Sequence, residues 1–276
     1  EVLFANVDNL TQAHVINLVC TRQSKPIFTT HGLEARNARQ LIASLLPADE
    51  ATDNFRGSME SVRLILDGWA ALSKNKLHQM SVEEAVGDLV YNFAGCLLLG
   101  SPIDRSLIGK VFPMPNYLPR YPTIPVTLLP SFHIMQSALT EMFEQSKQSS
   151  NWEQVANKAA AVGLSERGAF EQLFTAITFN AAGLSNSILN GILLASLMPN
   201  RGQQLLEDDK HLTSFAWELL RHNGPTVMMR LIEDTMIETA EGSHHKLRSG
   251  TIVLCSTSMA QRDGSQWKDP SIFRSR

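Results

Sequence analysis

One uninterrupted helical run limits the kind of fold that this chain can adopt. From Ser165 to Met198 the sequence contains no proline, begins on a residue that caps helix N-termini and stops at Pro199 and Asn200. At about 1.5 Å per residue, such a run predicts a helix of roughly 50 Å, which few globular proteins contain. We therefore expect a large, mainly helical protein in which further helices pack on this one.

The rest of the sequence predicts more helices and a small sheet. Ser81 and Glu84 form a capping box ahead of an apolar run that Gly100 ends, and residues 57–74 alternate apolar and charged faces at a helical period. Seven of the twelve prolines lie in residues 102–130, which we expect to form a structured loop. Strand patterns occur only at 227–237 and 251–256. The predicted fold class is mainly α with a small β-sheet.

Charge and cysteine content disfavour several functions. The 24 Lys and Arg against 27 Asp and Glu give a net charge of −3 without a long run of like charges, so we expect no nucleic-acid partner. Cys20, Cys96 and Cys255 form no CxxC pair, which disfavours a disulfide framework or a zinc site and suits a reducing intracellular compartment. No signal peptide or transmembrane stretch is visible, which leaves peripheral contact with a membrane open.

Motifs of other enzyme classes are missing. The sequence contains neither GxSxG nor HExxH, and its glycines form no GxGxxG or phosphate-binding loop. His244 and His245 form the only histidine doublet, within the polar segment EGSHHKLRSG. We interpret this segment as an exposed loop rather than a metal site.

The most specific pattern lies in the last part of the chain. Glu218 and Arg221 are three residues apart on a predicted helix, where they share a face and can form a charge-assisted pair. Pro225, Arg230 and the sequence RDGSQWKDPSIFRSR follow in that order. This series resembles the cytochrome P-450 superfamily, in which an ExxR helix is followed by a strand arginine and by a PERF-like segment.

The resemblance implies a P-450-like fold that binds haem b. Residues 203–222 would form the ExxR helix, and Glu218, Arg221 and Arg276 would form a buried ion-pair triad that holds the haem-binding region. Arg230 in the strands of 225–276, and Arg39 in an earlier helix, would contact the haem propionates. The segment FRSR keeps only the Phe and the final Arg of a PERF pattern.

The superfamily's FxxGxxxC loop, whose thiolate ligates the haem iron, does not occur in this sequence. None of the three cysteines has that context, so we expect no metal ligand in the chain and place the axial cysteine beyond its end. The sequence also begins on Glu1 rather than Met. We therefore expect residues 1–276 to form one partial P-450 domain, incomplete at both ends, with the long helix at 165–198.

The centre of the long helix indicates a branch of the superfamily. The stretch FTAITFNAAGLSNSILN lacks the acid and the threonine with which monooxygenases deliver protons to bound dioxygen. It resembles the FNAxGG centre of the allene oxide synthase and hydroperoxide lyase family: Phe179, Asn180, Ala181 and Gly183 match, and Leu184 replaces the second glycine. The resemblance implies that Asn180 faces the peroxide of the substrate, with Ala181, Gly183 and Leu184 along the substrate channel. An amide suits this role because it both donates and accepts hydrogen bonds.

Members of that family rearrange or cleave polyunsaturated fatty-acid hydroperoxides without dioxygen or a reductase. The resemblance thus implies a lipid hydroperoxide or another apolar small molecule as ligand and no redox partner, and Leu184 leaves the product open. Two alternatives remain: a P-450 monooxygenase that uses dioxygen and a redox partner, and a truncated, non-catalytic helical protein. An Asn180 that only hydrogen-bonds within its own helix is equally compatible with the sequence.

Overall fold

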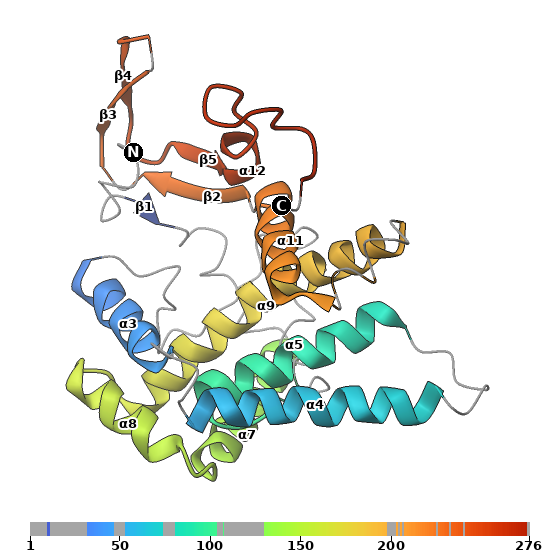
Figure 1. Cartoon of the computed structure of the whole chain (residues 1–276). Coiled ribbons are helices and arrows are strands. Elements are labelled where there is room, and N and C mark those ends of the chain that lie inside the picture. Colours follow the sequence, from blue (N-terminus) through green and yellow to red (C-terminus); the bar gives the residue numbers. More distant parts are fainter. Residues whose placement is uncertain are drawn as a thin grey trace. The chain divides into compact units, whose positions relative to one another are not determined.

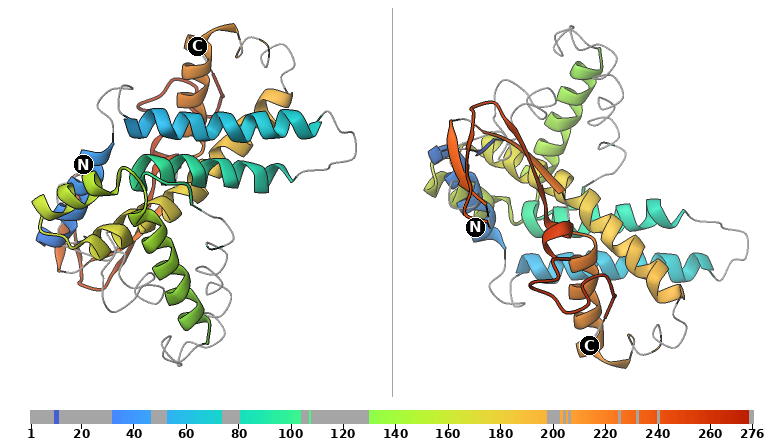
Figure 2. Two further views of the ribbon diagram at one scale, coloured as in Figure 1. Left: turned by 90° about the horizontal axis from the view of Figure 1, so that it is seen from below. Right: turned by 90° about the horizontal axis from the view of Figure 1, so that it is seen from above.

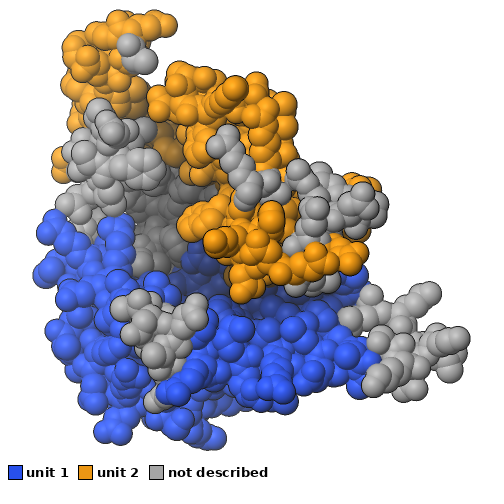
Figure 3. All heavy atoms as spheres, in the orientation of Figure 1, with its two compact units in different colours: residues 1–181 blue, residues 182–276 orange. Residues whose placement is uncertain are grey.

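The computed structural model describes residues 10–11, 32–46, 53–73, 81–103, 107, 130–197, 203, 205, 207–224, 226–231, 233–239 and 241–274. Helices account for most of these residues, and the strands β2 to β5 follow only after α11, as Figure 1 shows. The prediction of a mainly α fold with a small sheet is therefore confirmed. The chain divides into two compact units, residues 1–181 and 182–276, which are coloured separately in Figure 3.

Among the described residues of unit 1, the elements are helices apart from the short strand β1 (Leu10–Thr11). Its helices are α3 (Gly32–Leu45), α4 (Asp53–Ser73), α5 (Val82–Leu99), α7 (Pro130–Lys147), α8 (Trp152–Ala161) and the first part of α9 (Glu166–Leu197). Helices α4 and α5 lie side by side in both views of Figure 2. The buried core of this unit includes Leu41, Leu99, Val155, Phe170 and Leu173. Burial of such side chains contributes most of the stability of these helices, because isolated helices of this length are only marginally stable in water.

The predicted ends of α5 are confirmed. The Ser81 hydroxyl accepts a hydrogen bond from the backbone N–H of Glu84 at 3.4 Å, which satisfies one of the N–H groups left open at a helix start. Gly100 closes the helix with a φ of 71°, a left-handed conformation that glycine adopts without steric cost. A Cβ on Gly100 would also lie 2.7 Å from the Cβ of Asn151.

Helix α9 is the long helix of the structure and runs from Glu166 to Leu197. The Ser165 hydroxyl accepts a hydrogen bond from the backbone N–H of Gly168 at 3.1 Å and so caps its start. Within unit 1 the helix is almost wholly buried from Ala169 to Thr178, which explains its scarcity of charged residues.

Unit 2 contains the rest of α9, α11 (Asp209–His222), β2 (Thr226–Leu231), β3 (Thr235–Glu238), β4 (His244–Leu247), β5 (Ile252–Ser256) and α12 (Thr257–Ala260). Strands β2 and β5 pair antiparallel, with Met228 opposite Leu254. Gly191 lets α11 pack closely on the end of α9, since a Cβ there would lie 2.9 Å from a methyl group of Leu219.

Two predictions about the strands are wrong. The strand expected at 227–237 is two strands, because β2 ends at Leu231 and β3 begins at Thr235. Between them, the Asp234 carboxylate accepts the backbone N–H of Ser249 at 2.8 Å. His244 and His245 lie on β4 rather than in a loop, paired with Glu238 and Ile237 across the hairpin. The sequence did not indicate this strand, because β4 is exposed along most of its length and its residues are mostly polar.

Most of the proline-rich stretch, namely residues 108–129, lies outside the described residues, as does Cys20. None of the helices in the described part of the chain combines the length and the apolar character needed to cross a membrane.

Candidate functional site

Helix α11 carries the Glu218 and Arg221 pair. The helix begins at Asp209, later than the predicted residue 203, because Asp208 has an extended backbone and its carboxylate accepts the N–H of Lys210 at 2.9 Å. A side chain in this role is a strong helix start signal. The face that α11 buries includes Arg221, whose charge must be compensated within the protein.

The two side chains of the pair form a bidentate ion pair, as the sequence predicted for Glu218 and Arg221. Arg221 Nε donates to Glu218 Oε2, and Arg221 Nη2 donates to Glu218 Oε1, both at 2.8 Å. The side chains are 8% exposed for Arg221 and 13% for Glu218. Such a buried, two-point contact holds both groups in one geometry.

The remaining donors of Arg221 bind backbone carbonyls of the segment 261–274, which follows α12. Nη1 donates to the carbonyl oxygens of Gln261 at 2.8 Å and Pro270 at 2.9 Å, and Nη2 donates to that of Ile272 at 3.2 Å. The guanidinium also lies 5.3 Å from the ring centre of Trp267, within the range of a cation–π contact. One buried side chain therefore ties this irregular segment to α11.

Glu218 also binds the segment 261–274, through the backbone N–H of Arg274, which donates to Oε1 at 2.8 Å. The Arg274 guanidinium turns to the Asp269 carboxylate at 2.6 Å, and Asp269 itself has a left-handed φ of 53°. The third predicted member of the triad, Arg276, lies outside the described residues. The triad as a whole therefore stays a prediction, and the described contact to Glu218 comes from a backbone amide.

Aromatic packing supports the same junction. The Phe273 ring lies 5.3 Å from the ring of Phe215 and 5.3 Å from that of His222, both on α11. His222 Nε2 is 2.7 Å from Arg221 Nη2 and 3.5 Å from Glu218 Oε1. The His222 ring thus lies against both members of the ion pair.

These contacts lower the pKa of Glu218 to about 2: the hydrogen bond from Arg221 has the largest effect, burial opposes it, and the N–H of Arg274 lowers the pKa further. The same hydrogen bond raises the pKa of Arg221. Both groups are therefore charged at neutral pH and neutralise each other. A group that stays charged and fully paired is suited to hold structure rather than to exchange protons with a substrate.

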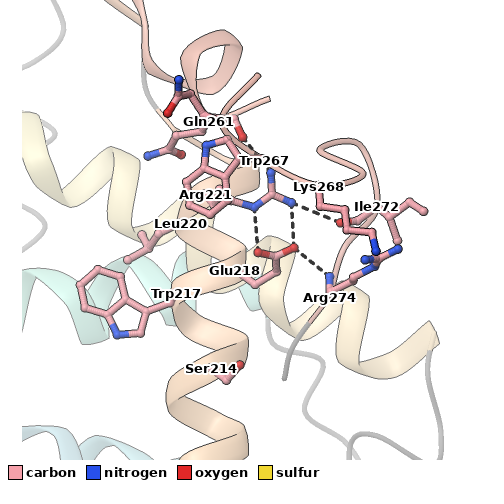
Figure 4. A pocket seen from close by; sticks show the side chains of 11 residues that line it. Ser214, Trp217, Glu218, Leu220, Arg221, Gln261, Trp267, Lys268, Ile272 and Arg274 are labelled. Atoms are coloured by element: carbon pink, nitrogen blue, oxygen red, sulfur yellow. Dashed lines mark hydrogen bonds and ion pairs between the residues drawn. The ribbon is translucent and has the colours of Figure 1, made fainter. Parts of the chain in front are cut away.

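A cavity of about 480 Å³ opens beside this junction. Figure 4 shows its lining, which combines the ion pair with side chains of α11 and of the segment 261–274. The residues are Ser214, Trp217, Glu218, Leu220, Arg221, Gln261, Gln266, Trp267, Lys268, Ile272 and Arg274.

The predicted substrate residues lie in the middle of α9. Asn180 is exposed, and its Nδ2 donates to the carbonyl oxygen of Ala176 at 2.7 Å, which leaves its Oδ1 as the group able to accept a hydrogen bond from a ligand. Ala181 is buried, Gly183 is exposed, and Leu184 has 41% of its surface exposed. Their assignment to a substrate channel stays a prediction.

The two predicted haem-propionate residues lie on different elements. Arg39 is exposed on α3, and Arg230 lies on β2 opposite Ile252. Their contact with haem stays a prediction. Within the described ranges no group of three His, Cys, Asp or Glu could hold a metal ion, and burial raises the pKa of the Cys96 thiol, which disfavours the thiolate that metal binding needs.

Sequence reasoning missed several residues of the junction. His222, Trp267 and Arg274 belong to it, and the sequence assigned a role to none of them, whereas Asp269-Pro270 and Phe273 were part of the series that resembles the superfamily. The carbonyl acceptors carry no sequence signal, because any residue offers a backbone oxygen. The dipeptide Asp269-Pro270 was visible as a turn signal, and it could have indicated where the chain folds back onto α11.

Neither a protein-family model nor a curated protein matches this chain. Solved structures do, and three examples are cytochromes P450. The polyketide-synthase cytochrome P450 PksS of Bacillus subtilis 168 matches with a TM-score of 0.63 at 18% identity over 99% of this chain and 70% of its own. Cytochrome P450EX alpha, solved with myristic acid, has a TM-score of 0.63 at 14% identity over 96% and 64%.

The third example, P450BioI in complex with acyl carrier protein ligated to hexadec-9Z-enoic acid, has a TM-score of 0.66 at 16% identity over 91% of this chain and 65% of its own. The chain thus spans about two thirds of the length of these structures. The expected cytochrome P450 fold is confirmed.

Proposed function

We propose that this chain is part of a haem-thiolate enzyme and that the enzyme converts polyunsaturated fatty-acid hydroperoxides without dioxygen or a reductase. The observation that carries the first part is the Glu218–Arg221 pair, which holds the segment 261–274 on α11 in a chain with the cytochrome P450 fold. A buried ion pair costs desolvation free energy, and a role that accounts for this cost is to hold one fixed local geometry.

The proposal gives some of the described residues a role toward haem. Arg39 and Arg230 would supply guanidinium groups to the two propionates, and the Glu218–Arg221 pair would hold the adjoining segment in place. The axial thiolate does not come from Cys96 or Cys255: the first sits within α5, and the second is paired opposite Val227 in the sheet. When bound, haem would supply the cleavage of the peroxide O–O bond.

The centre of α9 supports the hydroperoxide reaction over oxygen activation. The residues from Gly183 to Ser187 provide no carboxyl group, and the buried Ser187 hydroxyl donates to the Gly183 carbonyl oxygen at 3.0 Å. A hydroxyl engaged in its own helix is a poor proton donor to a ligand. The exposed Asn180, by contrast, offers its Oδ1 to a hydroperoxide O–H.

Fatty-acyl ligands also occur among the structural neighbours, namely myristic acid in one and an acyl carrier protein with a hexadecenoic acid in another. They support a long-chain acyl substrate for this fold. Leu184, which takes the place of the second glycine of the FNAxGG pattern, leaves open whether the product is an allene oxide, an aldehyde, a divinyl ether or an epoxy alcohol.

The test measures the loss of a polyunsaturated fatty-acid hydroperoxide by the haem-loaded protein, expressed from its full reading frame, without NADPH or reductase. We expect rapid loss that Asn180→Ala abolishes and that Asn190→Ala, an exposed amide on the same helix, leaves unchanged. Haem uptake with no peroxide loss, but with product formation once a reductase is added, would favour the monooxygenase. Failure to bind haem would favour the non-catalytic alternative.

A further inference from the structure

Four large apolar side chains are exposed around the cavity of unit 2. Trp217 and Leu220 lie on α11, whereas Trp267 and Ile272 belong to the segment 261–274. Their exposed fractions are 69% for Trp217, 45% for Leu220, 45% for Trp267 and 52% for Ile272. Apolar side chains that gather in one hollow mark a binding surface, because covering them with an apolar ligand removes them from water.

The size of the cavity suits a small molecule. Its volume of about 480 Å³ lies within the range of roughly 300–1,000 Å³ that is usual for small-molecule sites. Two indole rings in such a site supply large contact areas at little cost in side-chain entropy.

The same cavity is cationic on one side. Lys268 and Arg274 line it together, and Figure 4 shows them across Glu218 from Trp217. The Arg274 guanidinium is paired with Asp269, and the Glu218 and Arg221 charges neutralise each other. Lys268 is exposed and forms no ion pair with any residue that the structure describes, so its charge is available to a ligand.

We infer that this cavity binds an amphipathic carboxylate, that is, a molecule with one carboxylate and a hydrocarbon chain. The carboxylate pairs with the Lys268 ammonium group, and the hydrocarbon chain covers Trp217 and Leu220. A ligand with several phosphates would place more negative charge against one lysine than it can balance, and a neutral lipid would leave the lysine unused. The inference does not rest on the proposed reaction, because it involves neither haem nor α9.

The test uses the tryptophan fluorescence of the whole chain. The probe is stearate with a nitroxide spin label on its hydrocarbon chain, titrated below its micelle concentration, since a nitroxide quenches tryptophans that it approaches. We expect saturable quenching that Trp217→Phe reduces, because Trp267 stays in the cavity, and that Trp69→Phe retains. Lys268→Glu is expected to weaken binding about tenfold, because reversal replaces an attraction by a repulsion of similar size.

The matched control is Lys210→Glu, the same charge reversal at an exposed position near the start of α11. It should leave the affinity within about twofold of the parent chain. Lys268 and Trp217 are exposed, so both substitutions should leave the far-ultraviolet circular dichroism unchanged.

Equal affinity of the parent chain and Lys268→Glu would overturn the inference, as would equal affinity for a spin-labelled stearyl alcohol. Sedimentation of the chain with phosphatidylglycerol vesicles, without saturable quenching by monomeric stearate, would assign the cavity to a membrane surface instead. Normal quenching of an Asn180→Ala variant that has lost peroxide turnover would show that this site and the proposed reaction are separate.

Discussion

The backbone N–H of Arg274 donates to Glu218 Oε1 at 2.8 Å across 56 residues of sequence, while the Arg274 side chain points to another partner. Glu218 thus receives hydrogen bonds from Arg221 and from a backbone amide. The position of Arg274 at this contact is consequently set by its main chain, while its side chain pairs with Asp269.

Replacing Arg221 with Lys should destabilise the protein by about 3 kcal/mol, although the charge is kept. An ammonium group has three donors without the planar fork, so it cannot serve the Glu218 carboxylate and the carbonyl groups of the segment 261–274 at once. Urea unfolding followed by circular dichroism measures the difference. Arg63→Lys is the control, because Arg63 forms an exposed pair with Asp67 and should cost less than about 0.5 kcal/mol. Equal effects of the two substitutions would contradict a special role of the guanidinium.

Lowering the pH should reduce the free energy of unfolding through protonation of Glu218. Its pKa is lowered from an ordinary 4.5 to about 2, so the folded state holds its proton less tightly than the unfolded state. The contribution of this group is complete above about pH 5 and is lost as the pH falls toward 2, with a total on the order of 3 kcal/mol. Unfolding free energies measured between about pH 6 and pH 3 should fall more steeply for the parent chain than for Glu218→Gln. Parallel pH curves for the two proteins would argue against this assignment.

Two glycine substitutions should change stability in opposite directions. Gly100→Ala should destabilise by about 1–2 kcal/mol, because Gly100 has a φ of 71° and a Cβ there would meet the Cβ of Asn151. Gly57→Ala should stabilise by about 0.5–1 kcal/mol, since Gly57 lies inside α4 with no atom within 4 Å of an added Cβ. Thermal unfolding of both variants measures the two changes in stability. If both substitutions changed the stability in the same direction, the assigned geometry of Gly100 would be refuted.

Phe273→Ala should loosen the segment 261–274 from α11 and cost about 2 kcal/mol, because the ring packs on Phe215 and His222. Limited proteolysis should then cut that segment faster than in the parent chain. The neighbouring Ile272→Ala serves as control, because that side chain is largely exposed and its backbone carbonyl, which accepts from Arg221, is retained. Equal cleavage rates in the two variants would count against the packing role of Phe273.

Local signals predicted the helices well and the site only in part. The caps at Ser81 and Ser165 and the stop at Gly100 were visible because each acts on groups a few residues away. The Glu218–Arg221 pair was visible for the same reason, since its members are three residues apart on one helix.

Contacts that join distant parts of the chain could not be predicted in the same way. Nothing in a linear pattern shows that Pro270 and Ile272 offer their carbonyl oxygens to Arg221, or that Arg274 meets Glu218 through its backbone. Strand β4 was not predicted, because its polar residues are stabilised by pairing with β3 rather than by burial.

The dependence of the segment 261–274 on Arg221 has a consequence during protein synthesis. The carbonyl groups that bind this guanidinium lie 40, 49 and 51 residues later in the chain. At about 5–20 residues per second, a ribosome needs roughly 2–10 s to deliver them after α11 has been made. During that interval Arg221 already has Glu218 as its partner on the same helix, but the carbonyl groups of the segment 261–274 are missing, so this segment can bind α11 only after residues 261–274 have been made.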